Sequence, residues 1–153
     1  MWHVIAQTNR QAGFSLIELL VAVLILSIGL LGVAGLQTRS LQMNRSASLH
    51  SQATYLSAEI VERMRANRDA ALAGAYDVEA GVVPAGNDGP GRDLHDWKGA
   101  VYATLPMVEG LDTGASVEVD NAGRVTITIS WFDARWSDDP DQQLRQVQLV
   151  TEL

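Results

Sequence analysis

A membrane-length apolar segment near the start of the chain limits what this sequence can fold into. Residues 13–36 read GFSLIELLVAVLILSIGLLGVAGL, and the one charged side chain among them is Glu18. A helix of about 20 apolar residues is long enough to cross a bilayer. A carboxylate at the centre of such a helix raises the free energy of membrane insertion by roughly 2.5–3.5 kcal/mol. An acidic residue kept in a membrane segment at this cost indicates a functional site. We therefore expect a membrane helix with a functional acid close to its start.

Two simpler interpretations of this segment are available. A secretory signal peptide has a short apolar stretch followed by a small-residue cleavage site. Here the stretch is longer, and no A-x-A site with a following turn ends it. A plain signal anchor fits the length but needs no carboxylate at its entrance, and it stays as an alternative. The leader before the segment, MWHVIAQTNRQAG, has Arg10 as its one fully charged side chain.

The residues around the start of the segment, GFSLIELL, resemble the processing site of type IV prepilins and related pseudopilins. The resemblance implies that a prepilin peptidase cuts between Gly13 and Phe14 and then N-methylates Phe14. It also implies that Glu18 is the glutamate used in assembly. The leader departs from the family pattern because it carries less positive charge than many family members do.

Elementary helix geometry supports a role for Glu18 beside the resemblance. Residues four apart share one helix face, so a freed amine at Phe14 and the Glu18 carboxylate can approach each other. The helix dipole also favours an anion in the first turns. When such helices bundle away from lipid, an unpaired Glu18 would attract the terminal amine of a neighbour and set its register. The alternative is a Glu18 side chain that merely extends to the lipid headgroups.

The resemblance implies a location and a set of partners. The protein would sit in the inner membrane with a cytoplasmic N-terminus and a periplasmic C-terminal domain, and later in the pilus at the cell surface. The expected partners are the prepilin peptidase and methyltransferase, other minor pilins and the major pilin, the inner-membrane assembly platform and the lipid bilayer. We expect no cofactor. We also expect no nucleic-acid partner, since residues 71–153 carry five basic and fourteen acidic side chains.

The fold expected from the resemblance is α+β, with a long N-terminal helix packed on a small antiparallel sheet. No proline occurs before Pro84, which permits one helix from about Phe14 to about Ala73, with Gly74 as its stop. Its later part carries apolar residues at spacings of three and four, which is typical of a buried helix face: Leu49, Ala53, Leu56, Ile60 and Met64. The expected divisions are a leader at 1–13, a membrane and assembly half at 14–36, an amphipathic half at 37–73 and a C-terminal domain at 74–153.

Gly29, Gly32 and Gly35 recur every third residue near the end of the membrane segment. Glycine in a helix costs about 1 kcal/mol relative to alanine, so these three residues predict a softened stretch that can unwind or allow close helix contact. Ordinary tolerance of glycine in membrane helices explains them equally well.

The C-terminal domain begins with a loop, of which the glycine-rich stretch AGNDGPGRD is interpreted as an exposed connector. A second helix follows, with a stripe of Leu94, Trp97, Val101 and Leu105 that ends at Pro106. Alternating residues predict a hairpin with strands at 117–119 and 125–131, and a third strand at 145–151. The apolar faces of these strands need a partner, and the long helix is the nearest candidate.

We find no catalytic constellation in the sequence, and we expect no enzyme activity. Four aspartates cluster before the last strand, namely Asp133, Asp138, Asp139 and Asp141. They lack calcium-loop spacing, so a solvated loop is favoured over a calcium site. The three histidines, His3, His50 and His95, have no ligand-like spacing. The absence of cysteine excludes disulfides and thiolate metal sites.

A narrower resemblance concerns the stretch ERMRAN at 62–67, together with Trp97, the Leu105-Pro106 pair and the ITISWFD strand. These features are similar to type IV pilus modification proteins, the PilV-type minor pilins. The resemblance implies a low-abundance subunit that starts or caps pilus assembly and so supports twitching motility and adhesion. The main alternative is a minor pseudopilin of a type II secretion system. A membrane-tethered enzyme and an adhesin with a ligand-binding domain are further alternatives.

Overall fold

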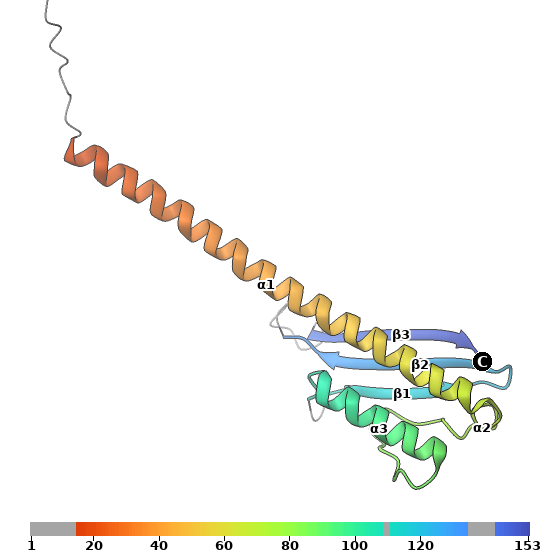
Figure 1. Cartoon of the computed structure of the whole chain (residues 1–153). Coiled ribbons are helices and arrows are strands. Elements are labelled where there is room, and N and C mark those ends of the chain that lie inside the picture. The colour runs from red at the N-terminus through yellow and green to blue at the C-terminus, as the bar shows by residue number, and fades with distance from the viewer. Residues whose placement is uncertain (1–14, 109–110, 135–142) are drawn as a thin grey trace, which may run out of the picture. The chain divides into compact units, whose positions relative to one another are not determined.

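The computed structural model describes residues 15–108, 111–134 and 143–153 of the chain (Figure 1). The predicted leader at 1–13 and Phe14 lie outside the described residues. The elements occur in the order α1 (Leu16–Ala66), α2 (Arg68–Leu72), α3 (Gly89–Thr104), β1 (Gly114–Val119), β2 (Arg124–Phe132) and β3 (Leu144–Glu152). The chain divides into two compact units, Met1–Leu41 and Gln42–Leu153, and each is described by itself.

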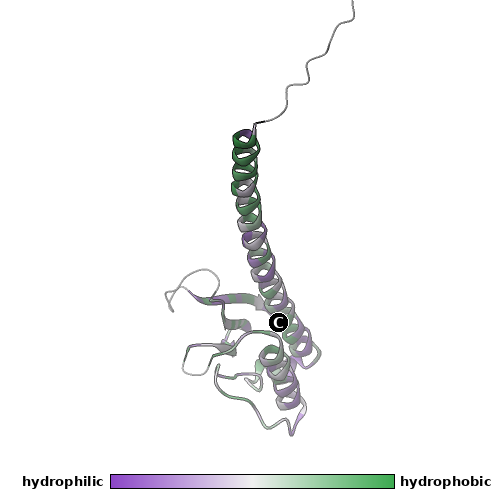
Figure 2. Cartoon of the chain, turned by 90° about the vertical axis from the view of Figure 1, so that its left-hand side faces the viewer, coloured by the Kyte–Doolittle hydropathy of each residue, from purple (hydrophilic) through white to green (hydrophobic). Residues whose placement is uncertain are grey.

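In the first unit, α1 is predominantly hydrophobic from Leu16 to Leu36 (Figure 2). All the large apolar side chains from Leu16 to Leu36 are exposed, and this is the one helix of the described residues that is long and apolar enough to cross a membrane. The hydroxyl groups of Ser27 and Thr38 donate hydrogen bonds to the carbonyl oxygens of Val23 and Ala34, at 2.7 and 3.1 Å. These hydroxyl donors are therefore satisfied within the helix, as a segment surrounded by lipid requires.

The second unit contains the later part of α1, and there the predicted apolar stripe is confirmed. Leu49, Ala53, Leu56, Ile60 and Met64 are all buried, and Ser57 and Val61 are buried beside them. The Ser57 hydroxyl donates to the carbonyl oxygen of Ala53 at 2.9 Å, which satisfies this polar group inside the core.

The long helix ends earlier than predicted. α1 stops at Ala66, and the short helix α2 follows after Asn67, whose backbone leaves helical geometry. The prediction of one uninterrupted helix to Ala73 is therefore wrong in its last turns. Gly74, the predicted stop of the long helix, instead follows the end of α2 and has φ +79°. The N–H groups of Gly74 and Ala75 donate to the carbonyl oxygens of Ala71 and Ala70, which is the Schellman arrangement that ends a helix.

The second predicted helix is present, but it begins sooner than expected. α3 starts at Gly89, so the second half of the glycine-rich stretch forms its first turn instead of an exposed connector. Asp88 caps this end by accepting a hydrogen bond from the Gly91 N–H at 2.6 Å, and Pro90 stands where a missing N–H costs nothing. The helix ends at Thr104, just before Pro106, as predicted.

The predicted strands form one three-stranded antiparallel sheet in the order β1-β2-β3. β1 and β2 make the expected hairpin, in which Val117 lies opposite Ile127, and β3 pairs with β2 so that Leu149 also lies opposite Ile127. The Asp120 carboxylate closes the hairpin turn by accepting hydrogen bonds from the N–H groups of Ala122 and Arg124, both at 2.8 Å. The bonds from these backbone groups, chiefly Arg124, lower the pKa of Asp120.

One core joins the sheet to the helices. The buried face of β2 consists of Val125, Ile127, Ile129 and Trp131, which belong to the same apolar cluster as the α1 stripe and the α3 residues Trp97 and Val101. The Trp97 indole donates a hydrogen bond to the Leu56 carbonyl oxygen at 2.8 Å. The predicted α+β class, with a long apolar N-terminal helix and a small antiparallel sheet, is confirmed.

Candidate functional site

Glu18 occupies the first turn of α1. It is exposed, as are its apolar neighbours Leu16, Ile17, Leu19 and Leu20, and within the described part of the chain it forms no salt bridge. A carboxylate at this position faces the positive end of the helix dipole. In an apolar surrounding it would need a cationic partner, because an unpaired charge there is costly. Gly13 and Phe14 lie outside the described residues, so the predicted approach of the Phe14 amine to Glu18 stays a prediction.

The three glycines of the membrane segment lie within regular helix. A Cβ added at Gly29, Gly32 or Gly35 would meet no atom within 4 Å. No contact within the described residues therefore requires glycine at these positions. Their predicted softening of the helix stays a prediction.

The end of α1 carries a network of ion pairs that reaches α3. Arg63 pairs with Glu59 at 2.5 Å and with Asp93 at 3.5 Å, and Arg65 pairs with Glu62 at 2.5 Å. The bond to Glu59, more than the other contacts, raises the pKa of Arg63. The two arginines of the ERMRAN stretch, Arg63 and Arg65, thus form ion pairs with carboxylates of α1 and α3. They also lie near the C-terminal end of α1, where the helix dipole favours cations.

The same network includes a buried tyrosine. The Tyr76 hydroxyl donates to Asp93 at 2.6 Å and accepts a hydrogen bond from the Asn67 side-chain amide at 3.0 Å. Burial, and then the bond to Asp93, raises the pKa of Tyr76 to about 12. A phenol with this pKa stays protonated near neutral pH. The group therefore acts as a structural donor that ties α3 to the end of α1.

Lys98 on α3 is a further buried polar residue that the sequence analysis did not identify. Its ammonium donates hydrogen bonds to the carbonyl oxygens of Glu79 and Val82, and to that of Ala80 at 3.2 Å. The Tyr102 hydroxyl also donates to Ala80, at 2.8 Å. Burial lowers the pKa of Lys98 to about 8. A stripe of apolar residues gives no sign that a lysine beside it is buried, because most lysines are exposed.

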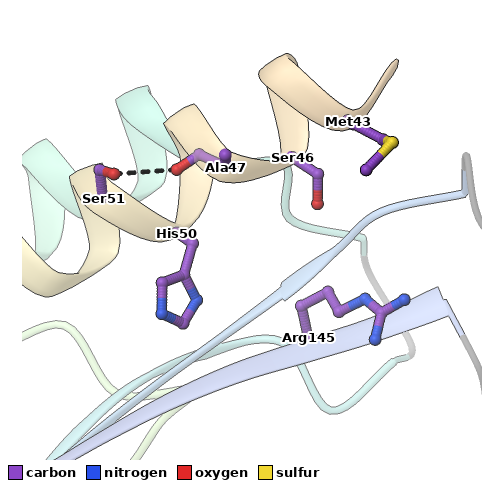
Figure 3. Close-up of a pocket in the computed structure, with 6 residues that line it drawn as sticks. All are labelled: Met43, Ser46, Ala47, His50, Ser51 and Arg145. Atoms are coloured by element: carbon purple, nitrogen blue, oxygen red, sulfur yellow. Dashed lines mark hydrogen bonds between the residues drawn. The ribbon is translucent and has the colours of Figure 1, made fainter. Parts of the chain in front are cut away.

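A groove opens between α1 and β3 in the second unit (Figure 3). Its lining consists of Met43, Ser46, Ala47, His50, Ser51 and Arg145. The Ser51 hydroxyl donates to the Ala47 carbonyl oxygen at 2.9 Å, and the His50 ring stands edge-on to Trp131 with ring centres 6.1 Å apart. The Ser51 hydroxyl is thus engaged by the helix, and the exposed His50 ring contacts the buried ring of Trp131. This is the geometry of a structural groove rather than that of a nucleophile with its base.

The structure brings no metal site together among the residues it describes. No group of three or more histidine, aspartate or glutamate side chains in residues 15–108, 111–134 and 143–153 could hold an ion. Asp133 is buried at the end of β2, whereas Asp138, Asp139 and Asp141 lie outside the described residues. The calcium hypothesis for this stretch is therefore not tested. His95 contacts the Pro84 carbonyl oxygen through Nδ1 at 2.9 Å.

Comparison with known families identifies the N-terminal segment. Residues 8–34 match the family described as the prokaryotic N-terminal methylation motif. The match includes Gly13, Phe14 and Glu18. It also includes Gly29 and Gly32 of the membrane segment. Together with the apolar helix, it supports a type IV pilin-like protein that is anchored in the inner membrane and processed by a prepilin peptidase. Proteins with this motif are structural rather than catalytic. No curated protein and no solved structure matches the chain.

Proposed function

We propose that this chain is a minor pilin that takes part in type IV pilus assembly, either in the initiating complex or at the tip. Through that role it would support pilus biogenesis, twitching motility and adhesion. The proposal is carried by one observation, which is a methylation motif at residues 8–34 that runs into a membrane-length helix with Glu18 in its first turn.

In the proposed mechanism, the prepilin peptidase cuts between Gly13 and Phe14 and methylates the new terminus. The freed amine and the Glu18 carboxylate then carry opposite charges at one end of an apolar helix. Inside a bundle of such helices, the lowest-energy arrangement pairs each acid with an amine, because an unpaired charge in an apolar medium is costly. Subunits that are out of register leave Glu18 unpaired, so this pairing selects the correct axial position.

The assignment to a PilV-type minor pilin depends on the ERMRAN stretch and the resemblance around it. The contacts of this stretch favour a structural reason for its sequence. Met64 fills the core, Arg63 pairs with Glu59 and Asp93, and Asn67 binds the Tyr76 hydroxyl. These contacts keep the C-terminal domain attached to α1, and any pilin or pseudopilin subunit needs such an attachment.

The second candidate is a minor pseudopilin of a type II secretion system. The methylation motif fits both systems, since both use processed helices of this kind. Deletion of the gene distinguishes them. Loss of surface pili with normal protein secretion supports the pilus role, whereas loss of secretion with normal pili supports the alternative.

The proposed processing is tested by replacing the residue before the cut. A Gly13→Val chain should accumulate at full length in the inner membrane and be missing from sheared surface filaments. The matched control is Gln7→Ala in the same leader, which should be cut as in the wild type. Mass spectrometry of the N-terminal peptide reads out both the cut and the methyl group. A wild-type protein that keeps its leader in its own envelope would overturn the proposal.

A further inference from the structure

We propose that the outer edge of β3 binds an extended strand contributed by another subunit of the assembly. This open edge is defined by Leu144, Gln146, Gln148, Val150 and Glu152. The expected partner strand is uncharged in its centre and carries apolar residues at alternate positions. The inference rests on the proposed function for its choice of partner. It adds an interaction surface in the C-terminal domain to the one in the membrane helix.

The hydrogen bonds at both ends of β3 show which of its residues face outward. The Asp133 N–H donates to the Gln143 carbonyl oxygen at 2.7 Å, and the Leu153 N–H donates to the Gly123 carbonyl oxygen at 3.2 Å. Pairs of residues in an antiparallel ladder alternate between bonded and non-bonded. The odd-numbered residues of β3 therefore bond to β2. The even-numbered residues direct their N–H and C=O groups toward the open edge.

The opposite edge of the same sheet is covered. Val117 of β1 exchanges two hydrogen bonds with Val78, at 2.9 and 3.0 Å. The Val119 N–H donates to the Asp77 carboxylate at 2.8 Å. Within the residues that the structure describes, no strand or bridge covers β3 in this way. The described part of the chain thus covers the β1 edge and adds no strand at the β3 edge (Figure 1).

β3 also lacks most of the features by which proteins protect an edge. Native edges are blunted by proline, lysine, bulges or a short length. β3 has nine residues without proline or lysine, and its pairing with β2 continues through all nine without a bulge. Its charged residues, Arg145 and Glu152, stand near its two ends. The stretch between them offers regular backbone groups to an added strand, which is the basis of recognition by strand addition.

The side chains of β3 indicate the chemistry of the partner. On the inner side of the sheet, Val147 and Leu149 pack against the core but stay partly exposed. A neighbouring strand with apolar residues at alternate positions would complete their burial. On the outer side, Gln146 and Gln148 are exposed and uncharged. Residues 71–153 carry nine more acidic than basic side chains, and within them this neutral stretch suits a partner strand with an uncharged centre.

The test compares variants of the full chain for their incorporation into sheared surface filaments. Gln148→Pro removes one outward N–H and leaves the bonds to β2, so proline is acceptable there. We expect its level in filaments to fall at least tenfold. The matched controls are Gln148→Ala, which keeps the N–H, and Thr128→Ala, which changes the residue opposite on β2. Both controls should reach wild-type levels.

A second variant covers the case in which Gln148→Pro fails to fold. The pair Gln146→Lys and Val150→Lys places charges along the edge, as protected edges do, without changing a ladder bond. It should melt like the wild type in detergent and be lost from filaments. Normal incorporation of this pair overturns the inference, and so does an equal loss with Gln148→Ala, which would indicate side-chain docking instead. Absence of the wild-type chain from filaments overturns the proposed function itself.

Discussion

At the scale of single residues, Lys98 shows how one side chain can organise a loop. It is the only lysine of the chain, and it is fully buried. Three carbonyl oxygens between Glu79 and Val82 accept its hydrogen bonds. The same loop passes so close to Gly114, which has φ +152°, that a Cβ there would lie 2.8 Å from the Ala80 oxygen. Lys98 thus holds the loop against α3, at a point where the loop also passes close to β1.

The depressed pKa of Lys98 predicts how stability depends on pH. Its pKa is about 8 in the folded protein and 10.5 in the unfolded chain. Between these values the unfolded chain binds more protons, so the free energy of unfolding should rise with pH. The rise is at most about 3.5 kcal/mol, since the two values differ by 2.5 pKa units and one unit corresponds to about 1.4 kcal/mol. Denaturant unfolding in detergent at pH 8 and pH 10 measures it.

Lys98→Met is the control for this effect. It keeps most of the apolar stem and removes the titrating group, so the rise between pH 8 and pH 10 should disappear. A rise of the same size in the variant would show that another group is responsible. Tyr76 cannot mimic the effect, because its pKa of about 12 makes stability fall as the phenols of the unfolded chain ionise near pH 10.

Assembly into filaments should be most sensitive to substitution of Glu18. Glu18→Ala should insert into the membrane as well as the wild type, because it only makes the segment more apolar. It should be depleted from filaments, since the partner amine then has no acid to bind. Glu18→Asp keeps the charge on a shorter side chain and should retain part of the incorporation. Quantitative immunoblots of membranes and sheared filaments measure both steps, and normal incorporation of Glu18→Ala would contradict the assigned role.

At the scale of elements, the start of α3 depends on a cap. Asp88 satisfies the Gly91 N–H at 2.6 Å, and loss of such a cap costs about 0.5–2 kcal/mol. We expect Asp88→Ala to lower the free energy of unfolding by that amount, and Asp88→Asn to preserve most of it. Asp112→Ala, a change in a loop of the same domain, should have an effect below about 0.5 kcal/mol. Equal stability of Asp88→Ala and wild type would show that the cap is dispensable.

The elements differ in how well the sequence predicts them, and the reason is physical. The α1 stripe and the alternation in β2 and β3 are properties of neighbouring residues, so periodicity alone predicts them. The break at Asn67 accompanies hydrogen bonds from its side chain to Tyr76 and Asp93, which are distant in sequence. The sequence pattern does not predict the early start of α3, because glycine and proline, which usually mark loops, here form a capped first turn.

The residues of the candidate site also differ in how well the sequence predicts them. Gly13, Phe14 and Glu18 form a linear motif whose spacing can be read directly from the chain, and the match at residues 8–34 contains all three. Lys98 and Tyr76 could not be predicted as buried polar groups. Their hydrogen-bond partners come from segments 16–19 and 9–17 residues away. No local pattern records such contacts, because they arise only when the loop between α2 and α3 has folded.

At the scale of the whole molecule, the division into two units predicts that the second unit folds without the first. Among the residues that the structure describes, all the buried core residues, from Leu49 to Trp131, lie within Gln42–Leu153. The exposed apolar side chains of the first unit contribute nothing to this core. A fragment that begins at Gln42 should therefore be soluble without detergent and unfold cooperatively. Its free energy of unfolding should lie within about 1 kcal/mol of that of the full chain.

A shorter fragment tests whether the apolar stripe sets this boundary. A chain that begins at Leu56 lacks Leu49 and Ala53, which are buried in the core, and His50, which contacts the Trp131 ring. Removal of the buried Leu49 side chain alone should cost about 1.5–3 kcal/mol, so this fragment should melt well below the longer one. Circular dichroism at 222 nm during heating and urea titration measures both fragments. The prediction is contradicted if the fragment from Gln42 shows no cooperative transition while the full chain does. In that case the membrane half of α1 is part of the folding unit, and the C-terminal domain does not fold independently of it.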